Sequence, residues 1–382
     1  MKIGRNWAWI VLGAFIICLV FPAAAKAETL DIKAESYILV DADSGQVLLA
    51  HNEHNKMAPA SMTKLMTLIL VAQDLEAGKA SLTDMVVASE NAWKMGGSQI
   101  YLEPGEKLSL EEMLISIAVG SANDACVAVA EHLEGSHEAF VERMNKTARE
   151  MGLQDTNFVN SYGLPAEGHY SSTYDMAVIA RAALKYPKLL EYSSIKEYDL
   201  RNGEFKLFNT NKLLWWYQGA DGFKTGWTNE AKYCLTATVK RDGLRLIAVV
   251  MASPEPRGNF RDSMLLFNYG YAKHAYKSFF EKGNVCGAVK VGKGLADSIE
   301  VVAAADVGTI CLKGEEKSLA YNQVLPRYVD APIVKNQKIG EIEIYKDQTL
   351  VKKVDLVAAQ DVPEAGVLKE ILKLLQGVFL LR

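Results

Sequence analysis

The sequence predicts an α/β domain followed by a small all-β module and a terminal helix. β-rich runs stand near both ends of the first 273 residues, with helical spacing of apolar residues between them. From about Ala275, short β-branched runs alternate with Gly, Asp and Lys turns. About 355 residues remain after an N-terminal export signal. A chain of that length is longer than a single hydrophobic core usually supports, which favours two domains.

The first 27 residues have the pattern of this export signal. Lys2 and Arg5 precede an apolar run from Trp7 to Phe21, and Ala25-Lys26-Ala27 then offers small residues at a cleavage site. The run is shorter than the roughly 20 apolar residues that cross a bilayer. We expect residues 1–27 to be a cleaved signal peptide, and an uncleaved N-terminal anchor is the alternative.

Charge and cysteine content narrow the class of protein. The signal segment contains three of the 42 basic residues and no acid, so 39 basic residues remain against 46 acidic ones, a net charge of −7. This argues against nucleic acid, which requires a basic stripe. The remaining cysteines, Cys126, Cys234, Cys286 and Cys311, form no Cys-x-x-Cys pair. Neither a zinc site nor a disulfide framework is indicated. We expect free buried thiols, with a Cys286–Cys311 pair as the alternative.

The α/β domain begins and ends with strands. Two β-rich runs flank Asp43-Ser44-Gly45 and indicate a hairpin, and Asp242-Gly243 indicates another. Helical spacing runs from Met62 to Leu75, with Ser61 placed as its N-cap. Further helices are expected at Leu110–Val119, Asn123–Leu133, His137–Met151 and Thr173–Leu184, and strands at Tyr233–Val239 and Leu244–Met251. The first and last segments should therefore close one sheet.

The all-β module contains short runs at Ile299–Val302, Ile339–Tyr345 and Thr349–Val354. It contains no constellation of candidate catalytic residues, which favours a spacer or docking role.

The tail from Gly366 is expected to form an amphipathic helix. Apolar residues recur at helical spacing, whereas Lys369, Glu370, Lys373 and Gln376 fall on the other side. With three charges, it suits the membrane interface better than a span across the bilayer. Packing on the β module or on a second copy of the chain is the alternative.

Ser61 and Lys64 form the first candidate site. Three residues along a helix place two side chains on one face, so these two can meet. A serine hydroxyl needs a base within hydrogen-bond reach, and a lysine becomes a base only if burial or a second cation lowers its pKa. An ordinary capped helix is the alternative, and a second Ser-x-x-Lys pattern occurs at Ser193 and Lys196.

Ser121-Ala122-Asn123 lies in a turn between two expected buried helices and can direct a hydroxyl and a carboxamide into a cleft. A helix N-cap is the alternative, and Ser89-Glu90-Asn91 has the same pattern.

Lys224-Thr225-Gly226 precedes the Tyr233 strand and combines a cation, a hydroxyl and a residue without a side chain, which lets a substrate backbone come close. An edge strand there could pair with a peptide substrate, and a surface turn is the alternative.

The three motifs in this order resemble the penicillin-binding and serine β-lactamase superfamily. The stretches "APASMTKLMT", "GSANDACVAVAEHL", "NFVNSYGLPAEGHYSSTYDMA" and "DGFKTGWTNEAKYCLTAT" are similar to the low-molecular-mass D-alanyl-D-alanine carboxypeptidases, nearly over the full length. The resemblance implies an antiparallel sheet with helices on its faces over residues 28–273, a β-rich domain over 274–365 and a membrane-anchor helix over 366–382. It implies no metal or cofactor.

The resemblance also implies a reaction. Ser61 would attack the penultimate D-alanine of a peptidoglycan stem peptide and release the terminal D-alanine, with Lys64 accepting the hydroxyl proton. Ser121 would relay a proton to the leaving amine. Penicillin and other β-lactams would acylate the same serine. The enzyme would work outside the cell, at the outer face of the cytoplasmic membrane and the cell wall.

Substrate binding is implied for five more residues. Asn123 would bind the substrate amide. Lys224 would keep Lys64 neutral and attract the terminal carboxylate, and Thr225 would donate to that carboxylate. Gly226 would allow close approach, and the backbone N–H groups of Trp227 and of the nucleophile would form the oxyanion hole.

Two positions depart from the pattern of the resembled family. An arginine that follows the last core strand in relatives is Asn259 here, with Arg257 and Arg261 on either side. Relatives often carry Asn-Arg-Asn before Lys-Thr-Gly, whereas this chain has Asn209-Thr210-Asn211. His169 lies in the "HYSS" stretch, where structural and catalytic roles are both open.

Three other functions share part of this pattern. A class A β-lactamase would need a Glu-x-x-Leu-Asn loop, which is absent between Asn123 and Lys224. An endopeptidase that cuts cross-links shares the motifs and remains open. A non-catalytic wall-binding or penicillin-sensing module would not need an intact set of candidate catalytic residues.

Overall fold

The computed structural model describes residues 30–366 of the 382-residue chain. The expected signal peptide and residues 367–382 of the expected terminal helix lie outside this range. The described helices are α1 (Lys64–Glu76), α2 (Glu90–Trp93), α3 (Leu110–Ile115), α4 (Asn123–Glu134), α5 (His137–Glu150), α6 (Thr173–Ala183), α7 (Pro187–Ser194), α8 (Leu213–Trp216) and α9 (Gly258–Lys273). Short 3₁₀ turns lie at Ala60–Thr63, Arg201–Gly203 and Glu316–Ser318, and a π-helical turn lies at Ser116–Gly120.

A five-stranded antiparallel sheet, in the order β2-β1-β9-β8-β7, organises the α/β domain. Its strands are β1 (Ser36–Asp41), β2 (Val47–His51), β7 (Ala220–Thr228), β8 (Lys232–Arg241) and β9 (Leu244–Ser253). β1 pairs with β9, with Ile38 opposite Val249, so the first and last segments close the sheet as the sequence predicts. Both predicted hairpins are present. Two small hairpins, β3 (Met85–Val87) with β4 (Lys107–Ser109) and β5 (Glu197–Leu200) with β6 (Phe205–Phe208), lie among the helices.

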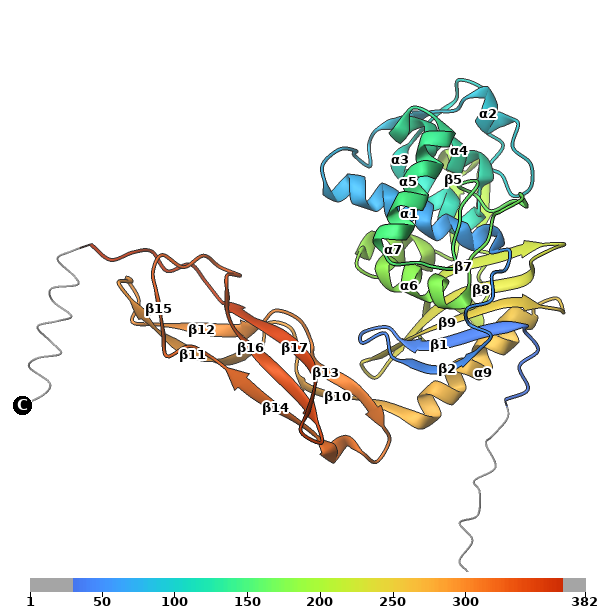
Figure 1. Cartoon of the computed structure of the whole chain (residues 1–382). Helices are drawn as coiled ribbons and strands as arrows, with labels where there is room; N and C mark the ends of the chain where they lie inside the picture. Colours follow the sequence, from blue (N-terminus) through green and yellow to red (C-terminus); the bar gives the residue numbers. More distant parts are fainter. Residues whose placement is uncertain (1–29, 367–382) are drawn as a thin grey trace, which may run out of the picture. The chain divides into compact units, whose positions relative to one another are not determined.

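Helices cover both faces of this sheet, as Figure 1 shows for α6 on one side and α9 on the other. The strands supply the two cores by alternation, because successive side chains of a strand point to opposite faces. Ile38 and Val40 join the larger core around α1. Leu39 between them joins the core that Phe260 and Phe267 of α9 complete.

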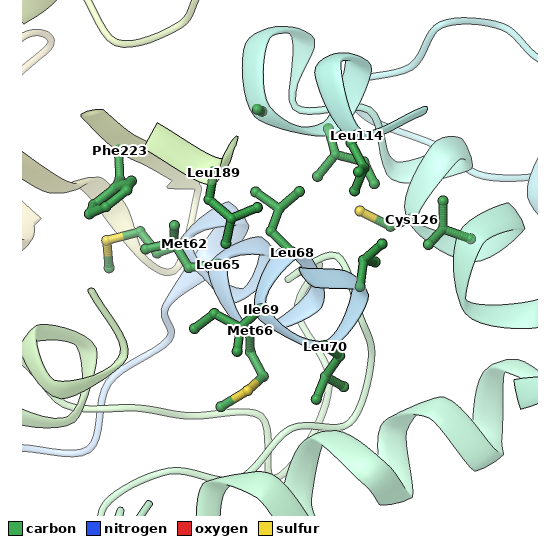
Figure 2. Close-up of a cluster of buried hydrophobic side chains, with 14 of the residues drawn as sticks. Met62, Leu65, Met66, Leu68, Ile69, Leu70, Leu114, Cys126, Leu189 and Phe223 are labelled. Carbon is green, nitrogen blue, oxygen red and sulfur yellow. The ribbon is translucent and has the colours of Figure 1, made fainter. Parts of the chain in front are cut away.

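Helix α1 lies inside the larger core. Every residue from Met62 to Ala72 is buried, which is expected of a helix that is apolar on nearly all sides. Figure 2 shows side chains of other elements packed around it, among them Leu114, Cys126, Leu189 and Phe223. A polar side chain on this helix is therefore removed from water, and Lys64 is one.

The C-terminal part of the described chain is all-β and has its own core, which includes Val301, Ile342 and Leu356. A six-stranded sheet has the order β14-β16-β17-β12-β11-β15, and β10 pairs with β13. These strands are β10 (His274–Phe280), β11 (Val285–Gly292), β12 (Ser298–Ala303), β13 (Val307–Leu312), β14 (Leu319–Val324), β15 (Tyr328–Asp330), β16 (Lys338–Lys346) and β17 (Thr349–Ala358). Cys286 and Cys311 are free and buried, as are Cys126 and Cys234.

Within residues 30–366, no helix combines the length and the apolar character that crossing a membrane requires.

Candidate active site

Ser61 lies in the 3₁₀ turn Ala60–Thr63 that leads into α1. The helix itself begins at Lys64, two residues later than predicted, and its N-cap is Thr63 with no side-chain capping bond. The expectation that Ser61 caps the helix is therefore wrong. The reason is local geometry, since Ser61 already has helical turn conformation and its hydroxyl faces Lys64 instead of the helix N–H groups. A partly exposed serine on a tight turn is accessible to a substrate.

Two glycines let this turn pack against its neighbours. A Cβ atom on Gly163 would lie 1.9 Å from the carbonyl oxygen of Ala60, and Gly163 also has a φ of +90°. A Cβ atom on Gly226 would lie 2.8 Å from the carbonyl oxygen of Pro59 and 3.3 Å from the nitrogen of Ser61. From the sequence, a substrate backbone is expected to occupy the space at Gly226. In the structure that space holds the backbone of the nucleophile turn, and β7 thus lies directly beside the Ser61 N–H.

Lys64 makes three hydrogen bonds from a fully buried position. Its Nζ lies 2.9 Å from Ser61 Oγ, 2.7 Å from Asn123 Oδ1 and 2.6 Å from the carbonyl oxygen of Tyr162. An ammonium group has three donors and can satisfy all three contacts. A neutral amine has two, and it can give both to the amide and carbonyl oxygens, which can only accept. Its lone pair then faces the Ser61 hydroxyl, which is the orientation that a general base requires.

Burial makes this neutral form accessible. Desolvation lowers the pKa of Lys64 to about 8, against smaller opposing effects of Cys126 and Asp124. Burial, followed by the positive charge of Lys64, lowers the pKa of Lys224 to about 7. Lys224 is also buried, and its Nζ makes two long contacts within residues 30–366, 3.5 Å to Thr210 Oγ and 3.4 Å to the Thr225 carbonyl. The two lysines thus occupy one desolvated, mutually repelling site.

The turn with Ser121 and Asn123 connects the π-helical turn Ser116–Gly120 to α4. Ser121 is buried and has the left-handed conformation, with φ 62° and ψ 32°, which is uncommon outside glycine and is often found at functional sites. The N-cap of α4 is Ala122, and no side chain caps it. The capping alternative is therefore wrong for both residues, because Asn123 is the first helical residue and its amide is bound to Lys64.

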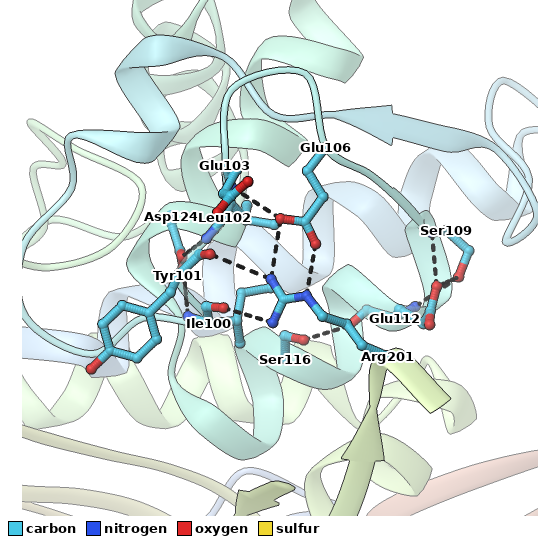
Figure 3. A network of polar contacts seen from close by, with 10 residues as sticks. All are labelled: Ile100, Tyr101, Leu102, Glu103, Glu106, Ser109, Glu112, Ser116, Asp124 and Arg201. Carbon is cyan, nitrogen blue, oxygen red and sulfur yellow. Dashed lines mark hydrogen bonds and ion pairs between the residues drawn. The ribbon is translucent and has the colours of Figure 1, made fainter. Parts of the chain in front are cut away.

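The loop before α3 fixes the orientation of the Asn123 amide. Asn123 Nδ2 donates to the Gly96 carbonyl (2.7 Å), and Asn123 N–H donates to the Ser98 carbonyl (2.8 Å), so Oδ1 must face Lys64. Figure 3 shows how the same loop is held further along. Asp124 accepts from the N–H groups of Ile100 and Leu102 (3.1 Å to Oδ2 for both), and Arg201 donates to the Ile100 carbonyl (2.9 Å) and is bound to Glu106 (2.7 Å).

Lys224, Thr225 and Gly226 lie inside β7, not in a surface turn before a strand. β7 is an edge strand of the five-stranded sheet, so one row of its backbone groups has no partner strand among the described residues. Thr225 Oγ donates to Thr210 Oγ (2.7 Å), and Trp227 is more than half exposed at the end of the strand, opposite Tyr233. A peptide added along this edge would pass the Ser61 turn.

His169 contacts the Ala60–Thr63 turn that contains the nucleophile. The Val159 N–H donates to its Nδ1 (2.9 Å), so the ring proton is on Nε2, which lies 2.9 Å from Thr63 Oγ. Burial, followed by the charge of Lys64, lowers its pKa to about 4, so the ring is neutral at pH 7. These contacts indicate a structural role for His169, which links the Val159 backbone to the turn that contains Ser61.

Arg257, Asn259 and Arg261 lie where the resembled family has an arginine after the last core strand, and each has a different environment. Asn259 is buried. Arg261 forms an ion pair with Asp262 (2.9 Å), and the guanidinium of Arg257 lies over the ring of Trp216 (5.7 Å).

The duplicate motifs are not assembled into a site. Ser193 Oγ donates to a carbonyl of its own helix (3.2 Å), whereas Lys196 lies over the ring of Trp215. Ser89 caps α2 by accepting from the Ala92 N–H (3.0 Å).

Three participants were missed by the sequence argument, namely the Tyr162 carbonyl, Gly163 and Thr210. The first is a backbone atom and has no residue signature. Gly163 stands in the Tyr-Gly-Leu-Pro turn, where the need for a glycine could have been noticed. Within residues 30–366, no group of three or more His, Cys, Asp or Glu side chains is arranged to hold a metal ion.

The chain is similar to several known proteins. The chain is 38% identical to D-alanyl-D-alanine carboxypeptidase DacF of Bacillus subtilis over 371 residues, 95% of each chain. The crystal structure of penicillin-binding protein 5 from Haemophilus influenzae is similar, with a TM-score of 0.68 and 34% identity over 87% of this chain and 98% of that one. Penicillin-binding protein D2 from Listeria monocytogenes in its ampicillin-bound form has a TM-score of 0.59 and 29% identity, over 64% and 99%.

Two family matches divide the chain between them. Residues 275–364 match the C-terminal domain of penicillin-binding protein 5. Residues 23–255, which carry the assembled motifs, match the family described as D-alanyl-D-alanine carboxypeptidase. The chain therefore belongs to the D-alanyl-D-alanine carboxypeptidase family.

Proposed function

We propose that Ser61, Lys64 and Ser121 catalyse the family's reaction and that Asn123, Lys224, Thr225 and Trp227 bind the substrate, with Gly226 contributing to the substrate site by letting β7 pack against the nucleophile turn. The enzyme is a serine-type D-alanyl-D-alanine carboxypeptidase, which removes the terminal D-alanine of peptidoglycan stem pentapeptides through a serine acyl-enzyme. The observation that carries the assignment of residues is the Lys64 amine, buried and held 2.9 Å from Ser61 Oγ between two fixed acceptors.

In the acylation step, Ser61 Oγ attacks the carbonyl carbon of the penultimate D-alanine while its proton passes to the lone pair of Lys64. The oxyanion is stabilised by the N–H groups of Ser61 and Trp227, and such preorganised donors are usually a major part of the rate enhancement. Ser121 relays this proton: it gives its own hydroxyl proton to the amine of the terminal D-alanine as the C–N bond breaks and takes the proton that Lys64 had accepted, so Lys64 is neutral again. Asn123 both fixes Lys64 and offers its amide to the substrate.

The lysine pair links substrate binding to activation of the nucleophile. The pKa values of about 8 and 7 mean that the free pair readily carries a single proton near pH 7 to 8. A substrate carboxylate placed by Lys224 and Thr225 favours the charged form of Lys224. The charge on Lys224 then disfavours a second charge on Lys64. The substrate thereby draws the shared proton to Lys224 and leaves Lys64 as the free base.

Hydrolysis completes the cycle. Water attacks the ester carbonyl with Lys64 accepting its proton, and the proton returns to Ser61 Oγ as the C–O bond breaks. A β-lactam ring presents a carbonyl and a carboxylate in the same relation, so penicillin acylates Ser61 by the same step.

The reaction is tested with two acylated tripeptides that end in D-alanyl-D-alanine or in D-alanyl-L-alanine. We expect release of the terminal residue from the first peptide alone, because only its carboxylate can lie at Lys224 while the scissile carbonyl lies at Ser61. Equal release from both peptides, or from neither while penicillin still labels the protein, would contradict the proposed function. A cross-linked peptide dimer in the same assay reports any endopeptidase activity.

We further propose that the protein is exported by the signal peptide at residues 1–27 and lies at the outer face of the cytoplasmic membrane. The domain limits 28–273, 274–365 and 366–382 belong to the same proposal. The sequence patterns of residues 1–27 and 366–382 support this proposal. The location of the peptidoglycan substrate outside the cytoplasm supports it as well. The apolar side of the tail would rest in the lipid interface, which would hold the β module and the site toward the wall.

Removal of residues 366–382 from the mature chain is expected to abolish sedimentation with anionic lipid vesicles and to leave D-alanine release unchanged. Leu375→Glu should have the same effect, because it places a charge on the apolar side of the helical pattern. The neighbouring variant Gln376→Glu adds the same charge on the polar side and should still sediment. Sedimentation unchanged by truncation, or a truncated protein that does not fold, favours packing of the tail on the protein.

A further inference from the structure

The Tyr162 carbonyl, one of the two acceptors that orient Lys64, belongs to a short loop that is fixed from several sides. The preceding carbonyl, that of Ser161, accepts from Thr67 Oγ of α1 (2.6 Å). Asn160 Oδ1 accepts from the N–H groups of Tyr162 (3.2 Å) and Gly163 (2.6 Å). These contacts hold the loop along its length, and a further contact to it comes from a histidine on another element.

His137 is the first residue of α5 and lies against this loop. The Ser161 N–H donates to His137 Nε2 (3.3 Å), and Ser161 Oγ lies 3.0 Å from the same nitrogen. The imidazole ring also stacks on the Tyr162 ring, with centroids 5.5 Å apart and planes at 22°. Because a backbone N–H points at Nε2, this nitrogen must be unprotonated, and the neutral ring carries its proton on Nδ1.

On the basis of the proposed function, we propose that His137 is a positioning residue of the active site: its Nε2 and its ring hold the Ser161–Tyr162 segment so that the Tyr162 carbonyl stays on Lys64. Its described contacts are to Ser161 and Tyr162 and not to Ser61. It acts through the loop, by accepting the Ser161 N–H and by packing on the next side chain.

Loss of this support has two separable effects on Lys64. A displaced carbonyl no longer constrains the amine, so its lone pair is less often directed at Ser61, and the acylation rate falls. The same displacement removes an acceptor that the ammonium form uses, which lowers the pKa of Lys64 further. The acid limb of the rate profile then moves to lower pH. A merely structural loss would lower stability without moving this limb.

The groups that face His137 favour its neutral form at working pH. Burial lowers its pKa below the ordinary histidine value, against the smaller opposing charges of Glu138 on α5 and Glu131 on α4. Tyr162, the other neighbouring titratable group, has a pKa raised by burial and is uncharged in the same range.

The test compares two amide variants that differ by one methylene group. His137→Gln can place its Oε1 where Nε2 lies and accept from the Ser161 N–H, whereas the shorter side chain of His137→Asn cannot reach it. The second-order rate of acylation by a fluorescent penicillin is measured from pH 5 to 10, with unfolding temperatures. We expect a decrease of about 10-fold or more for the asparagine variant, with its acid limb at lower pH, and a rate within about twofold of wild type for glutamine.

Two more variants complete the experiment. His137→Phe keeps the ring on Tyr162 without an acceptor and should behave like asparagine. His132→Asn, on the exposed face of α4, is the matched control and should behave like wild type. Rates are normalised to the fraction of molecules that penicillin finally labels, so partial misfolding does not hide the result. Equal rates and equal acid limbs for Asn, Phe and wild type would overturn the proposal, and so would failure of Gln to retain activity. If wild-type protein is not acylated at all, the proposed function itself has failed.

Discussion

Ser61→Ala is expected to abolish covalent labelling by a fluorescent penicillin and to lower D-alanine release by about 10³-fold or more. The variant removes the only atom of the site that forms the acyl bond, so neither substrate nor β-lactam can be held covalently. Stability should change little, because Ser61 is partly exposed and its hydroxyl is bound only to Lys64 among the described side-chain contacts. Loss of one such bond costs about 0.5–1.5 kcal/mol in the free energy of unfolding. Labelling is followed on denaturing gels, and unfolding by thermal denaturation.

The second Ser-x-x-Lys pattern supplies the matched control for this experiment. Ser193→Ala removes a serine with the same spacing to a lysine but with its hydroxyl bonded inside α7. This variant should label and release D-alanine like wild type. Persistent labelling of purified Ser61→Ala would refute the assignment of the nucleophile, and loss of labelling in Ser193→Ala would identify the alternative.

Lys64→Arg is expected to be inactive in both assays, with a loss comparable to that of the serine variant. A guanidinium remains protonated in proteins, so it has no lone pair to accept the Ser61 proton. It also carries its donors in a planar fork, which cannot reproduce the three contacts of a single nitrogen. The measurement is the acylation rate and D-alanine release of the folded variant. Retention of more than a few per cent of either rate would show that another group is the base.

The wild-type pH profile provides an independent check on the same base. Lys64 must be neutral while Lys224 holds the shared proton, so kcat/KM should fall as the pH is lowered through the lower of the pair's two pKa values, about 7, below which both lysines of the free enzyme are charged. Because the substrate carboxylate favours the charged form of Lys224, it should lower the pKa of Lys64 further in the complex. The acid limb of kcat should therefore lie at lower pH than that of kcat/KM. Activity that stays flat down to acidic pH would contradict the assignment.

Local chemistry in the chain determined the order of strands and helices and the choice of candidate residues. Alternating apolar residues with turn residues at Asp43-Ser44-Gly45 and Asp242-Gly243 specify hairpins, because these signals act over a few neighbouring positions. The Ser61–Lys64 contact is of the same kind, since a spacing of three on a helical turn brings two side chains together. The resemblance of four stretches then identified the family that the comparisons show.

Conformations that depend on packing could not be predicted. Propensity favours the capping role expected of Ser61 and the capping alternative for the 121–123 turn, yet neither helix has a side-chain cap. The core around α1 and the loop before α3 determine those conformations, and they override local preference. The space beside Gly226 was assigned to a substrate for a similar reason: only the tertiary fold shows that the chain's own Pro59–Ser61 backbone fills it.

The properties that make Lys64 a base were decided by the tertiary structure alone. Its second and third acceptors, Asn123 Oδ1 and the Tyr162 carbonyl, are 59 and 98 residues away along the chain. Its lowered pKa arises from desolvation inside a core that segments from several parts of the domain build together. The sequence identifies the residues that can act as nucleophile or base, because these capacities depend on the type of side chain. The protonation state and the orientation of these side chains depend on atoms far away in the sequence and on exclusion of water. Both conditions arise only when the chain has folded.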